Sequence, residues 1–545
     1  MTQRRSPRTP GAGSLRGVIR CAALLCAAQT VVVNQVAAQS TPADRAALFD
    51  YILAKTLERE SFSPVKNRTL RLDVEREMLR FRDELIAADS EEKLYYALAK
   101  ISNARKDRHL RINLVEGGIS LPDTTGVEQA NYPVPGSRVL HAPIRFATDY
   151  GTPGAYFVFV SDYAEDIRES GRGEAPGIGD KLIAVNGRDF ADYVAEIEPY
   201  HRYSTINGFW WQLATWIPQR SHQFPPEFYR ASLELILERR SGERYSLALP
   251  YLPPAEIEWV GHGERRYSGF TRVSSSESFD VYLCREKRIV LLQWHGFRDD
   301  LVTAVDRLME YAVDQDILDY AVVVDATRSG GGSLGAYAVR RLSPRPFKTT
   351  FGNLRISDIT QPFIEAMLRG IRRGDRGSLP PELDDGTWVS EWLERDVAKA
   401  IEAGQRYTNN VPFKLAHLPE YSDGIIDPAE LHFRGPLVCW FSPYGGSHLD
   451  QFASIIVDNE LGHTIGMSPG GYSNTWEWEE VLVFPRSQEP VVEFMWSIGH
   501  TIRPNGEILE GNPARVDEFV PQTRDDYLTY YDELMARTFQ HLGIR

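Results

Sequence analysis

The sequence predicts a layered α/β protein in which the α/β core follows a helical segment and a β-rich unit. From residue 280 onward, fully apolar strand-like runs alternate with amphipathic helical stretches, a pattern typical of a mostly parallel sheet. Between residues 41 and 105, apolar residues recur at helical spacing and glycine is absent. Between residues 119 and 250, short apolar runs are separated by glycine turns, which favours a β-rich unit.

The first 38 residues have the features of a signal peptide. A basic region comes first, formed by Arg4, Arg5, Arg8, Arg16 and Arg20, and an apolar stretch follows. Ala37 and Ala38 offer the small residues that a signal peptidase reads, so we expect cleavage after Ala38. The alternative is an uncleaved anchor helix, although the run is short for a span. We therefore expect an exported protein, periplasmic or extracellular, with no stable membrane span after cleavage.

Composition narrows the range of functions. The 545 residues are 42% hydrophobic and carry a net charge of −14. The length predicts more than one domain, and the acidic balance argues against nucleic-acid binding, which requires a basic field. After the leader, only Cys284 and Cys439 remain, and both one disulfide and two buried thiols are open. No Cys/His spacing resembles a metal site, and we expect no cofactor.

Four segments follow along the chain. They are a signal peptide over 1–38, a helical subdomain over 39–118, a β-rich domain with a helical insertion over 119–255, and an α/β domain over 280–545. Within the β-rich domain, residues 179–187 predict a turn, a strand and an Asn-Gly turn, and residues 233–249 predict a hairpin. The Gly/Pro-marked stretch 374–388 is expected to be a surface insertion.

Two glycine-rich loops follow apolar strands of the α/β domain. Residues 325–332, with the sequence DATRSGGG, leave backbone N–H groups uncovered, which suits an oxyanion hole but also an ordinary tight loop. Residues 444–448, with the sequence YGGSH, open a helix and place Ser447 near its positive end. The alternative is that Ser447 is a plain N-cap with Asp450 in the first turn.

Two further polar residues lie outside these loops. His109 belongs to an Asp-Arg-His element at the end of the helical region, within a short strand-like run over 109–114. Glu510 follows a turn at residues 506–507 and is expected to end a short strand. Taken singly, a histidine is more often structural and a carboxylate more often solvated, so only the combination of the four motifs predicts chemistry.

This ordered set resembles the S41 peptidase family, in the branch of C-terminal processing (tail-specific) proteases and the tricorn core. Members carry a helical N-terminal segment, an Asp-x-His element, a PDZ-like domain, an Asp…Gly-Gly-Gly loop, a Ser-x-x-acid helix and a late Glu. The resemblance covers residues 45 to 545. It implies a ClpP/crotonase-like core, a PDZ-like domain around residues 179–187, and a serine peptidase acting on exported proteins or peptides, cleavage near C-termini being one form of that activity.

The resemblance also implies roles for individual residues. Ser447 is the nucleophile, His109 the general base and Glu510 the acid that orients His109, directly or through a relay. The remaining positions are the oxyanion-hole residues Gly331 and His448 and the binding residues Gly330, Gly332 and Asp450.

The general base separates the branches of the family. One branch uses a lysine after the serine, but this chain has no lysine beyond Lys414, which excludes that dyad. The tricorn pattern has a serine directly before its histidine, where this chain has Arg108. His448 and His463 are therefore the fallback candidates for the base.

Two other functions stay open. Residues 331–335, with the sequence GGSLG, fit the nucleophile elbow of an α/β-hydrolase-type esterase using Ser333, with His500 and either Asp450 or Asp458 as partners. A non-catalytic peptide-binding protein on the same scaffold is the second alternative, motivated by Arg108 and the missing lysine. The expected partner is a polypeptide or peptide, and the oligomeric state is open.

Overall fold

The computed structural model of the protein describes residues 40–62, 66, 71–121, 139–169, 175–373, 390–412, 423–473 and 476–544. The signal peptide predicted over 1–38 and the surface insertion predicted over 374–388 lie outside the described residues. Within the described part, we find no helix that combines the length and the apolar character needed to cross a bilayer.

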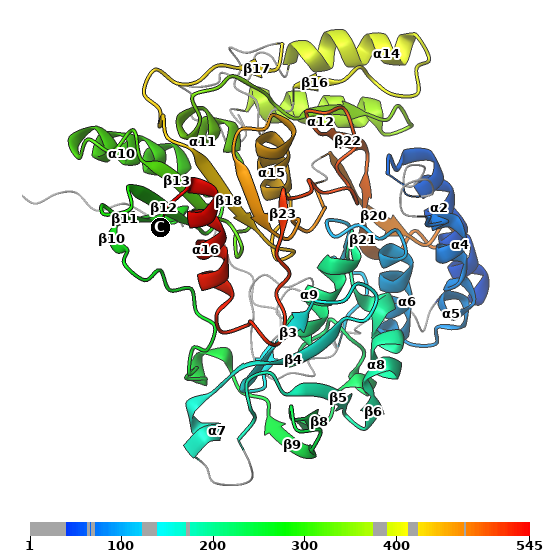
Figure 1. Cartoon of the computed structure of the whole chain (residues 1–545). Coiled ribbons are helices and arrows are strands. Elements are labelled where there is room, and N and C mark those ends of the chain that lie inside the picture. Colours follow the sequence, from blue (N-terminus) through cyan, green and yellow to red (C-terminus); the bar gives the residue numbers. More distant parts are fainter. Residues whose placement is uncertain are drawn as a thin grey trace, which may run out of the picture. The chain divides into compact units, whose positions relative to one another are not determined.

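A seven-stranded sheet forms the centre of the α/β region in the described residues (Figure 1). Its strands, in spatial order, are β10 (Thr271–Ser275), β11 (Phe279–Cys284), β12 (Ile289–Trp294), β13 (Ala321–Asp325), β18 (Leu437–Phe441), β19 (His463–Gly466) and β23 (Glu518–Phe519). The strands from β12 to β23 are parallel, whereas β10 and β11 are antiparallel additions at one edge. The predicted α/β sheet is thus present as a mixed sheet.

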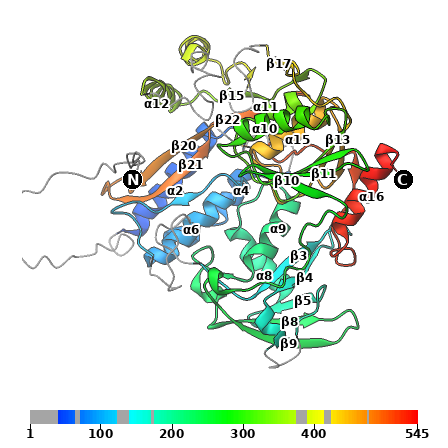
Figure 2. The ribbon, with the colours of Figure 1, turned by 90° about the vertical axis from the view of Figure 1, so that its left-hand side faces the viewer.

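Helices cover both faces of this sheet. On one face lie α10 (Leu301–Asp314), α11 (Gly335–Leu342) and α15 (His448–Asp458), which share an apolar core with the sheet. On the other face lies α16 (Tyr530–Leu542), whose Leu534 packs with Val323 and Trp440 (Figure 2). Coverage of both faces explains why β18 is apolar throughout and β13 is apolar up to the buried Asp325 at its end, since every side chain of a doubly covered strand is buried.

The predicted helical region consists of α2 (Pro42–Arg59), α4 (Val74–Leu79), α5 (Arg82–Ala87) and α6 (Glu91–Asn103). A capping box between Thr41 and Asp44 begins α2. The strand expected over 109–114 is shorter than predicted, because only β1 (Ile112–Asn113) pairs, with β21 (Pro490–Ser497). The neighbour of β21 is β20 (Glu477–Val483), so a late segment of the chain joins the N-terminal helices.

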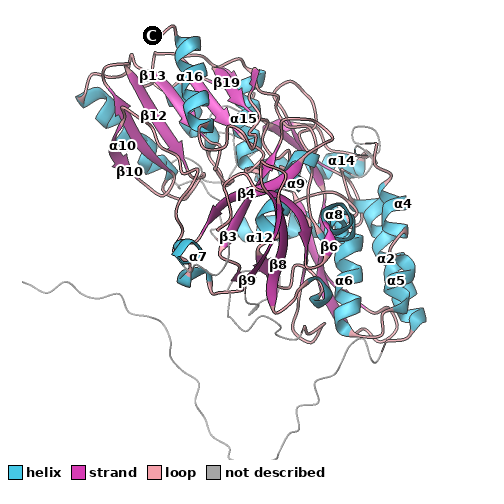
Figure 3. Ribbon diagram, turned by 60° about the horizontal axis from the view of Figure 1, so that its bottom comes forward, coloured by secondary structure: helices cyan, strands magenta, loops and turns pink. Residues whose placement is uncertain are grey.

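A second sheet lies in the middle of the chain, and we call it the middle sheet (Figure 3). It contains β3 (Ile144–Asp149), β4 (Phe157–Tyr163), β5 (Lys181–Val185), β6 (Arg188–Asp189), β8 (Ser232–Glu238) and β9 (Arg244–Pro250). The predicted Asn-Gly turn joins β5 and β6, with φ of 52° at Asn186 and 81° at Gly187. The predicted hairpin is β8 and β9. The associated helices are α7 (Glu165–Glu169), α8 (Phe190–Ile197) and the aromatic α9 (Ile206–Trp216).

Smaller elements complete the described structure. The additional strands are β2 (Leu140–His141), β7 (Gln219–Arg220), β14 (Phe347–Lys348), β15 (Phe351–Leu354), β16 (Val411–Pro412), β17 (Ile425–Ile426) and β22 (Gly499–Ile502). The additional helices are α12 (Thr360–Arg372), α14 (Ala398–Glu402) and the short turns η1 (Glu198–Tyr200), η2 (Pro226–Phe228), η3 (Pro254–Glu256) and η4 (Trp392–Val397). One apolar cluster joins the N-terminal helices, the middle sheet and β20–β21. The domain boundaries given from the sequence stay a prediction.

The two cysteines of the α/β region are both free and buried. Cys284 lies on β11 and Cys439 on β18, and β12 and β13 lie between these strands. Burial raises the pKa of the Cys439 thiol. Of the two possibilities left open by the sequence, the structure therefore has two buried thiols.

Candidate active site

Two loops meet where β13 and β18 end. Because these strands are neighbours and parallel, the loops that follow them leave the same edge of the sheet. A Cβ atom added at Gly445 would lie 2.1 Å from the Ser329 carbonyl oxygen. A Cβ atom added at Gly331 would lie 2.7 Å from Ser447 Cβ and 3.1 Å from Ser447 Oγ. Glycine is therefore what lets the 325–332 loop approach the serine.

Ser447 has a backbone conformation that few residues other than glycine adopt. Its φ is 60° and its ψ is −125°, directly before α15. Within this fully described helix its side chain makes no capping hydrogen bond, so the interpretation of Ser447 as a side-chain N-cap is wrong. Its backbone N–H donates to the Tyr472 carbonyl oxygen at 2.5 Å. Backbone strain of this kind occurs mainly at functional sites and is held in place by the surrounding structure.

The three glycines of the first loop have different surroundings. Gly330 donates its N–H to the His295 carbonyl oxygen at 3.0 Å, and the carbonyl oxygen of Gly331 accepts from Phe297 N–H at 3.2 Å. Gly332 has a φ of 140°, and a Cβ atom there would lie 1.8 Å from the Phe297 carbonyl oxygen. Gly330 and Gly332 thus anchor the loop to residues 295–297, while Gly331 faces Ser447.

Asp325 fixes the start of the 325–332 loop. Its buried carboxylate accepts from Thr327 N–H at 3.0 Å, from Thr327 Oγ1 at 2.5 Å and from the Tyr267 hydroxyl at 2.5 Å. These hydrogen bonds satisfy a charge at the end of β13 and fix the start of the loop.

Neither fallback base lies in a position to serve Ser447. The His448 ring is buried in an edge-to-face contact with Phe297, and its Nε2 accepts from Gly335 N–H at 2.6 Å. Burial lowers the pKa of His448 to about 3. His463 begins β19, at the sheet edge opposite to Ser447, and its ring stacks on that of His541 at 3.9 Å. The backbone N–H of His448, in the first turn of α15, keeps its predicted place near Ser447.

His109 lies close to the Ser447 loop through Tyr472. The two rings of His109 and Tyr472 meet edge to face, with centroids 5.1 Å apart. The Tyr472 ring also covers Gly446, where an added Cβ atom would lie 2.0 Å from it. Packing around His109 lowers its pKa to about 4, and the Asp107 charge opposes this shift. His109 is therefore neutral at neutral pH and able to accept a proton.

The loop that carries Tyr472 is held by Asp450. The buried Asp450 carboxylate accepts from Gly471 N–H at 3.1 Å and from Tyr472 N–H at 3.0 Å, and burial raises its pKa to about 8. Asp450, predicted as a binding residue, thus supports Tyr472 from inside the protein. Tyr472 is not among the residues predicted from the sequence, since its place in the site depends on its contacts with His109 and Gly446.

Glu510 is buried, with 1% of its surface exposed, contrary to the solvated position usual for a lone carboxylate. The predicted strand before it is also wrong, because only a single bridge forms, between Ile508 and Ile502. Glu510 Oε2 accepts from Ser473 N–H at 3.1 Å. Burial and the Asp107 charge raise the pKa of Glu510 to about 8, whereas Lys66 and hydrogen bonds from Ser204 and Ser473 lower it.

Ser204 connects Glu510 to the segment that contains His109. The Ser204 hydroxyl accepts from Arg108 N–H at 3.2 Å, and its proximity to Glu510 lowers the pKa of that carboxyl. The serine of the tricorn pattern is absent at position 108, and a buried serine from the middle of the chain supplies a hydroxyl in this region instead. The Arg108 side chain turns outward and lies over the rings of Trp211 and Tyr472, at 5.0 Å and 4.5 Å.

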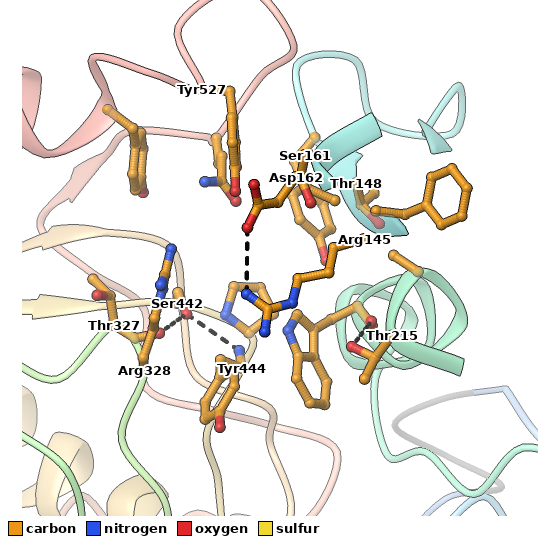
Figure 4. Close-up of a pocket in the computed structure, with 18 of the residues that line it drawn as sticks. Arg145, Thr148, Ser161, Asp162, Thr215, Thr327, Arg328, Ser442, Tyr444 and Tyr527 are labelled. Atoms are coloured by element: carbon orange, nitrogen blue, oxygen red, sulfur yellow. Dashed lines mark hydrogen bonds and ion pairs between the residues drawn. The ribbon is translucent and has the colours of Figure 1, made fainter. Parts of the chain in front are cut away.

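A cavity of about 560 Å³ is lined in part by Tyr444, at the start of the loop that carries Ser447 (Figure 4). Thr327, Arg328, Ser442 and Tyr444 contribute to it from the strand ends of the α/β region, and Arg145 and Asp162 contribute from the middle sheet. Arg145 pairs with Asp162 at 3.4 Å, and Arg328 Nη2 donates to the Gly263 carbonyl oxygen at 2.8 Å. Tyr444 lines this cavity and precedes Gly445-Gly446-Ser447 in the chain, whereas Ser447 itself is not one of the lining residues.

The partners predicted for Ser333 in the esterase alternative are engaged elsewhere in the structure. His500 Nε2 lies 2.9 Å from the Ser61 carbonyl oxygen, and its ring stacks on Tyr407, on the small sheet of β15, β16 and β22. Asp458 pairs with Arg503, and Asp450 is held by the 471–472 backbone. In the part of the chain that is described, no three His, Cys, Asp or Glu side chains gather in a way that would hold a metal ion.

Comparisons with known proteins agree with this architecture. No family model matches the chain, and no curated protein matches its sequence. The solved structure of mature CPAF matches with a TM-score of 0.64 at 12% identity, covering 91% of this chain and 96% of CPAF. Mature CPAF complexed with lactacystin gives a TM-score of 0.64 at 12% identity, covering 92% and 98%.

More distant structures are matched too, among them the photosystem II D1 C-terminal processing protease, with a TM-score of 0.37 at 12% identity over 87% of this chain and 93% of that chain. This score is too low to carry an argument. Over most of its length the chain has the fold of CPAF, and the resemblance to the S41 peptidases predicted from its motifs holds at the level of the fold.

Proposed function

We propose that this protein is a serine peptidase that hydrolyses peptide bonds in exported proteins or peptides, with Ser447 as nucleophile, His109 as general base and Glu510 as orienting acid. One observation carries the proposal: Ser447 combines a strained backbone, a hydroxyl not used for capping, and a neighbouring Gly331 at which an added Cβ atom would lie 3.1 Å from Ser447 Oγ. A serine that only caps a helix has no need of this combination.

The reaction follows from the chemistry of these groups. Ser447 Oγ attacks the scissile carbonyl carbon, and His109 accepts the hydroxyl proton and later gives it to the leaving amine. His109 is suited to the first step because it is neutral at neutral pH. The backbone N–H groups of Gly331 and His448 stabilise the negative oxygen of the tetrahedral intermediate. Glu510 lies beside the 107–109 segment, close to the Ser204 hydroxyl that accepts from Arg108 N–H.

The middle sheet and the adjoining cavity supply the binding functions in this proposal. A PDZ-like unit captures a peptide by adding it as a strand to an exposed sheet edge. The cavity, with Arg145, Asp162 and Arg328 beside aromatic rings, takes side chains on one side of the scissile bond. Cleavage near the C-termini of exported proteins is one form that the proposed peptidase activity takes.

Covalent labelling tests the proposal. The chain from residue 39 onward is treated with a fluorophosphonate, beside Ser447→Ala, His109→Ala and Ser333→Ala variants. We expect wild type and Ser333→Ala to label equally and Ser447→Ala not to label, with His109→Ala slowed at least about 100-fold because general-base catalysis is lost. Since CPAF has been solved in complex with lactacystin, lactacystin is added first as a competitor, and we expect it to protect Ser447.

Each other outcome points to a named alternative. Labelling that persists in Ser447→Ala but is lost in Ser333→Ala would assign the chemistry to the esterase elbow. A folded wild-type protein that does not label at all would leave the peptide-binding protein as the better interpretation. Cleavage of a protein substrate mixture by wild type, but not by Ser447→Ala, then separates a peptidase from an esterase.

A further inference from the structure

A cluster of buried charges lies around Glu510, and Lys66 is the cation that faces it; Arg105, a second buried cation of the cluster, pairs with Glu60 at 3.4 Å. The Lys66 side chain is fully buried, and its Nζ donates to the carbonyl oxygens of Arg105 at 3.0 Å and Lys106 at 2.7 Å. The same Nζ lies 3.5 Å from Glu510 Oε1 and 3.9 Å from Asp107 Oδ2. Glu510 and Asp107 are also fully buried in their side chains.

The surroundings of Lys66 define its chemical state. Four oxygen acceptors face one nitrogen, and two of them belong to carboxylates. An ammonium has three N–H donors and no acceptor, and suits such a shell, whereas a neutral amine would present a lone pair to oxygen atoms. Lys66 is therefore a hydrogen-bond donor and a counter-ion, and it is not a base for Ser447.

We propose that Lys66 is a positioning residue for the reaction at Ser447: its ammonium holds the carboxylate of Glu510 charged and in place within the cluster that also contains the 107–109 segment. This inference rests on the proposed peptidase function. Asp107 links the cluster to His109, because its Oδ1 accepts the His109 backbone N–H at 2.9 Å. A lysine thus does serve the site, although it comes from the N-terminal part of the chain and acts on the acid.

The charges in this cluster predict a distinctive pH dependence. Burial and Asp107 raise the pKa of Glu510 to about 8, and Lys66 opposes them. Tyr472 also faces Glu510, and Glu60 and Arg105 face Asp107, with Glu60 facing Lys66 as well. Glu477, whose pKa burial and Asp107 also raise to about 8, faces Asp107. If the reaction needs charged Glu510, the rate of Ser447 labelling rises with pH, with a midpoint at about pH 8. Removal of Lys66 should move this midpoint to higher pH, and removal of the Asp107 charge should move it to lower pH.

The first experiment measures the rate of fluorophosphonate labelling from about pH 6 to about pH 10. In Lys66→Met we expect the midpoint to move up by at least about one pH unit, as expected when a counter-ion within about 4 Å is removed. In Asp107→Asn we expect it to move down, since asparagine keeps the oxygen that accepts His109 N–H. Glu477→Gln is the matched control and is expected to keep the wild-type midpoint.

A second measurement does not depend on catalysis. The melting temperatures of wild type and Lys66→Met are compared across the same pH range. A carboxyl whose pKa is raised by folding costs stability as pH rises, until it ionises in the folded state. Wild type levels off above about pH 8, whereas Lys66→Met continues to lose stability, so the gap between them widens there. In a Glu510→Gln background we expect the gap to be constant.

The outcomes separate this inference from the proposed function. Labelling that depends on Ser447, with one midpoint shared by wild type, Lys66→Met and Asp107→Asn, would overturn the role of Lys66 and leave the peptidase intact. Absence of Ser447-dependent labelling, with the gap widening only where Glu510 is present, would overturn the peptidase and retain the Lys66–Glu510 coupling. A difference in melting temperature between wild type and Lys66→Met that stays constant with pH would mean that Lys66 contributes only packing. If Lys66→Met does not fold, the midpoint of Asp107→Asn decides.

Discussion

At the scale of single residues, the separation between Gly331 and Ser447 is what distinguishes this site from two ordinary loops. Gly331 packs against Ser447, where an added Cβ atom would lie 3.1 Å from the serine Oγ, whereas Gly330 N–H bonds to the His295 carbonyl oxygen and Gly332 packs against Phe297. An oxyanion-hole donor has to reach the substrate carbonyl oxygen beside Ser447 Oγ, and a Cβ atom at Gly331 would push the loop away from that position.

We therefore expect Gly331→Ala to lower the rate of Ser447 labelling by about 100-fold or more, the usual effect of losing one oxyanion-hole donor. A Cβ atom at this position would lie 2.7 Å from Ser447 Cβ, so the loop has to shift away from the serine. Ser333→Ala in the same loop is the control and is expected to label at the wild-type rate. Equal rates for the two variants would exclude Gly331 from the site.

Ser447 and Gly331 could be predicted from the sequence because their signal is local, a glycine-rich loop after an apolar strand. Lys66, Ser204 and Tyr472 could not be predicted, because each reaches the site through contacts with residues far away in the chain. Glu510 was found through the order of motifs, but its burial depends on packing that no local pattern reports.

At the scale of elements, the 470–472 loop joins the nucleophile helix to His109. Asp450 on α15 holds this loop by two backbone hydrogen bonds, and the Tyr472 ring fills the space between Gly446, His109 and Arg108. The strands and helices around it were largely predicted, since their periodicity is local, whereas the loop follows from the tertiary contacts of one ring.

Removal of that ring is expected to damage stability and the site together. We expect Tyr472→Ala to lower the free energy of unfolding by about 3–5 kcal/mol, as when other large aromatic side chains are truncated in a core. Labelling of Ser447 should fall as well, because His109 loses its neighbour. Tyr472→Phe keeps the ring and should retain both, as urea unfolding and labelling would show. Equal loss in both variants would mean that the hydroxyl, rather than the ring, supports the site.

At the scale of the whole molecule, ion pairs of one buried arginine join the N-terminal helix α2 to later parts of the described chain. Arg59 on α2 pairs with Asp358 and, through Nη1, with Glu480 on β20, and only 4% of its side chain is exposed. The sequence predicted α2 as an amphipathic helix but gave no sign of this ion pair, because its partners lie hundreds of positions away.

A comparison of two cations that share one carboxylate tests how much this junction contributes. We expect Arg59→Met to lower the free energy of unfolding by about 1–3 kcal/mol, less than the 3–5 kcal/mol of fully buried pairs because its partners keep some solvent. Lys55 also pairs with Asp358, at 2.6 Å, but 23% of its side chain is exposed. We expect Lys55→Met to cost at most about 1 kcal/mol, as for exposed ion pairs. Urea unfolding measures both, and equal losses would show that burial of Arg59 contributes nothing beyond a surface pair, so that apolar packing holds the N-terminal helices in place.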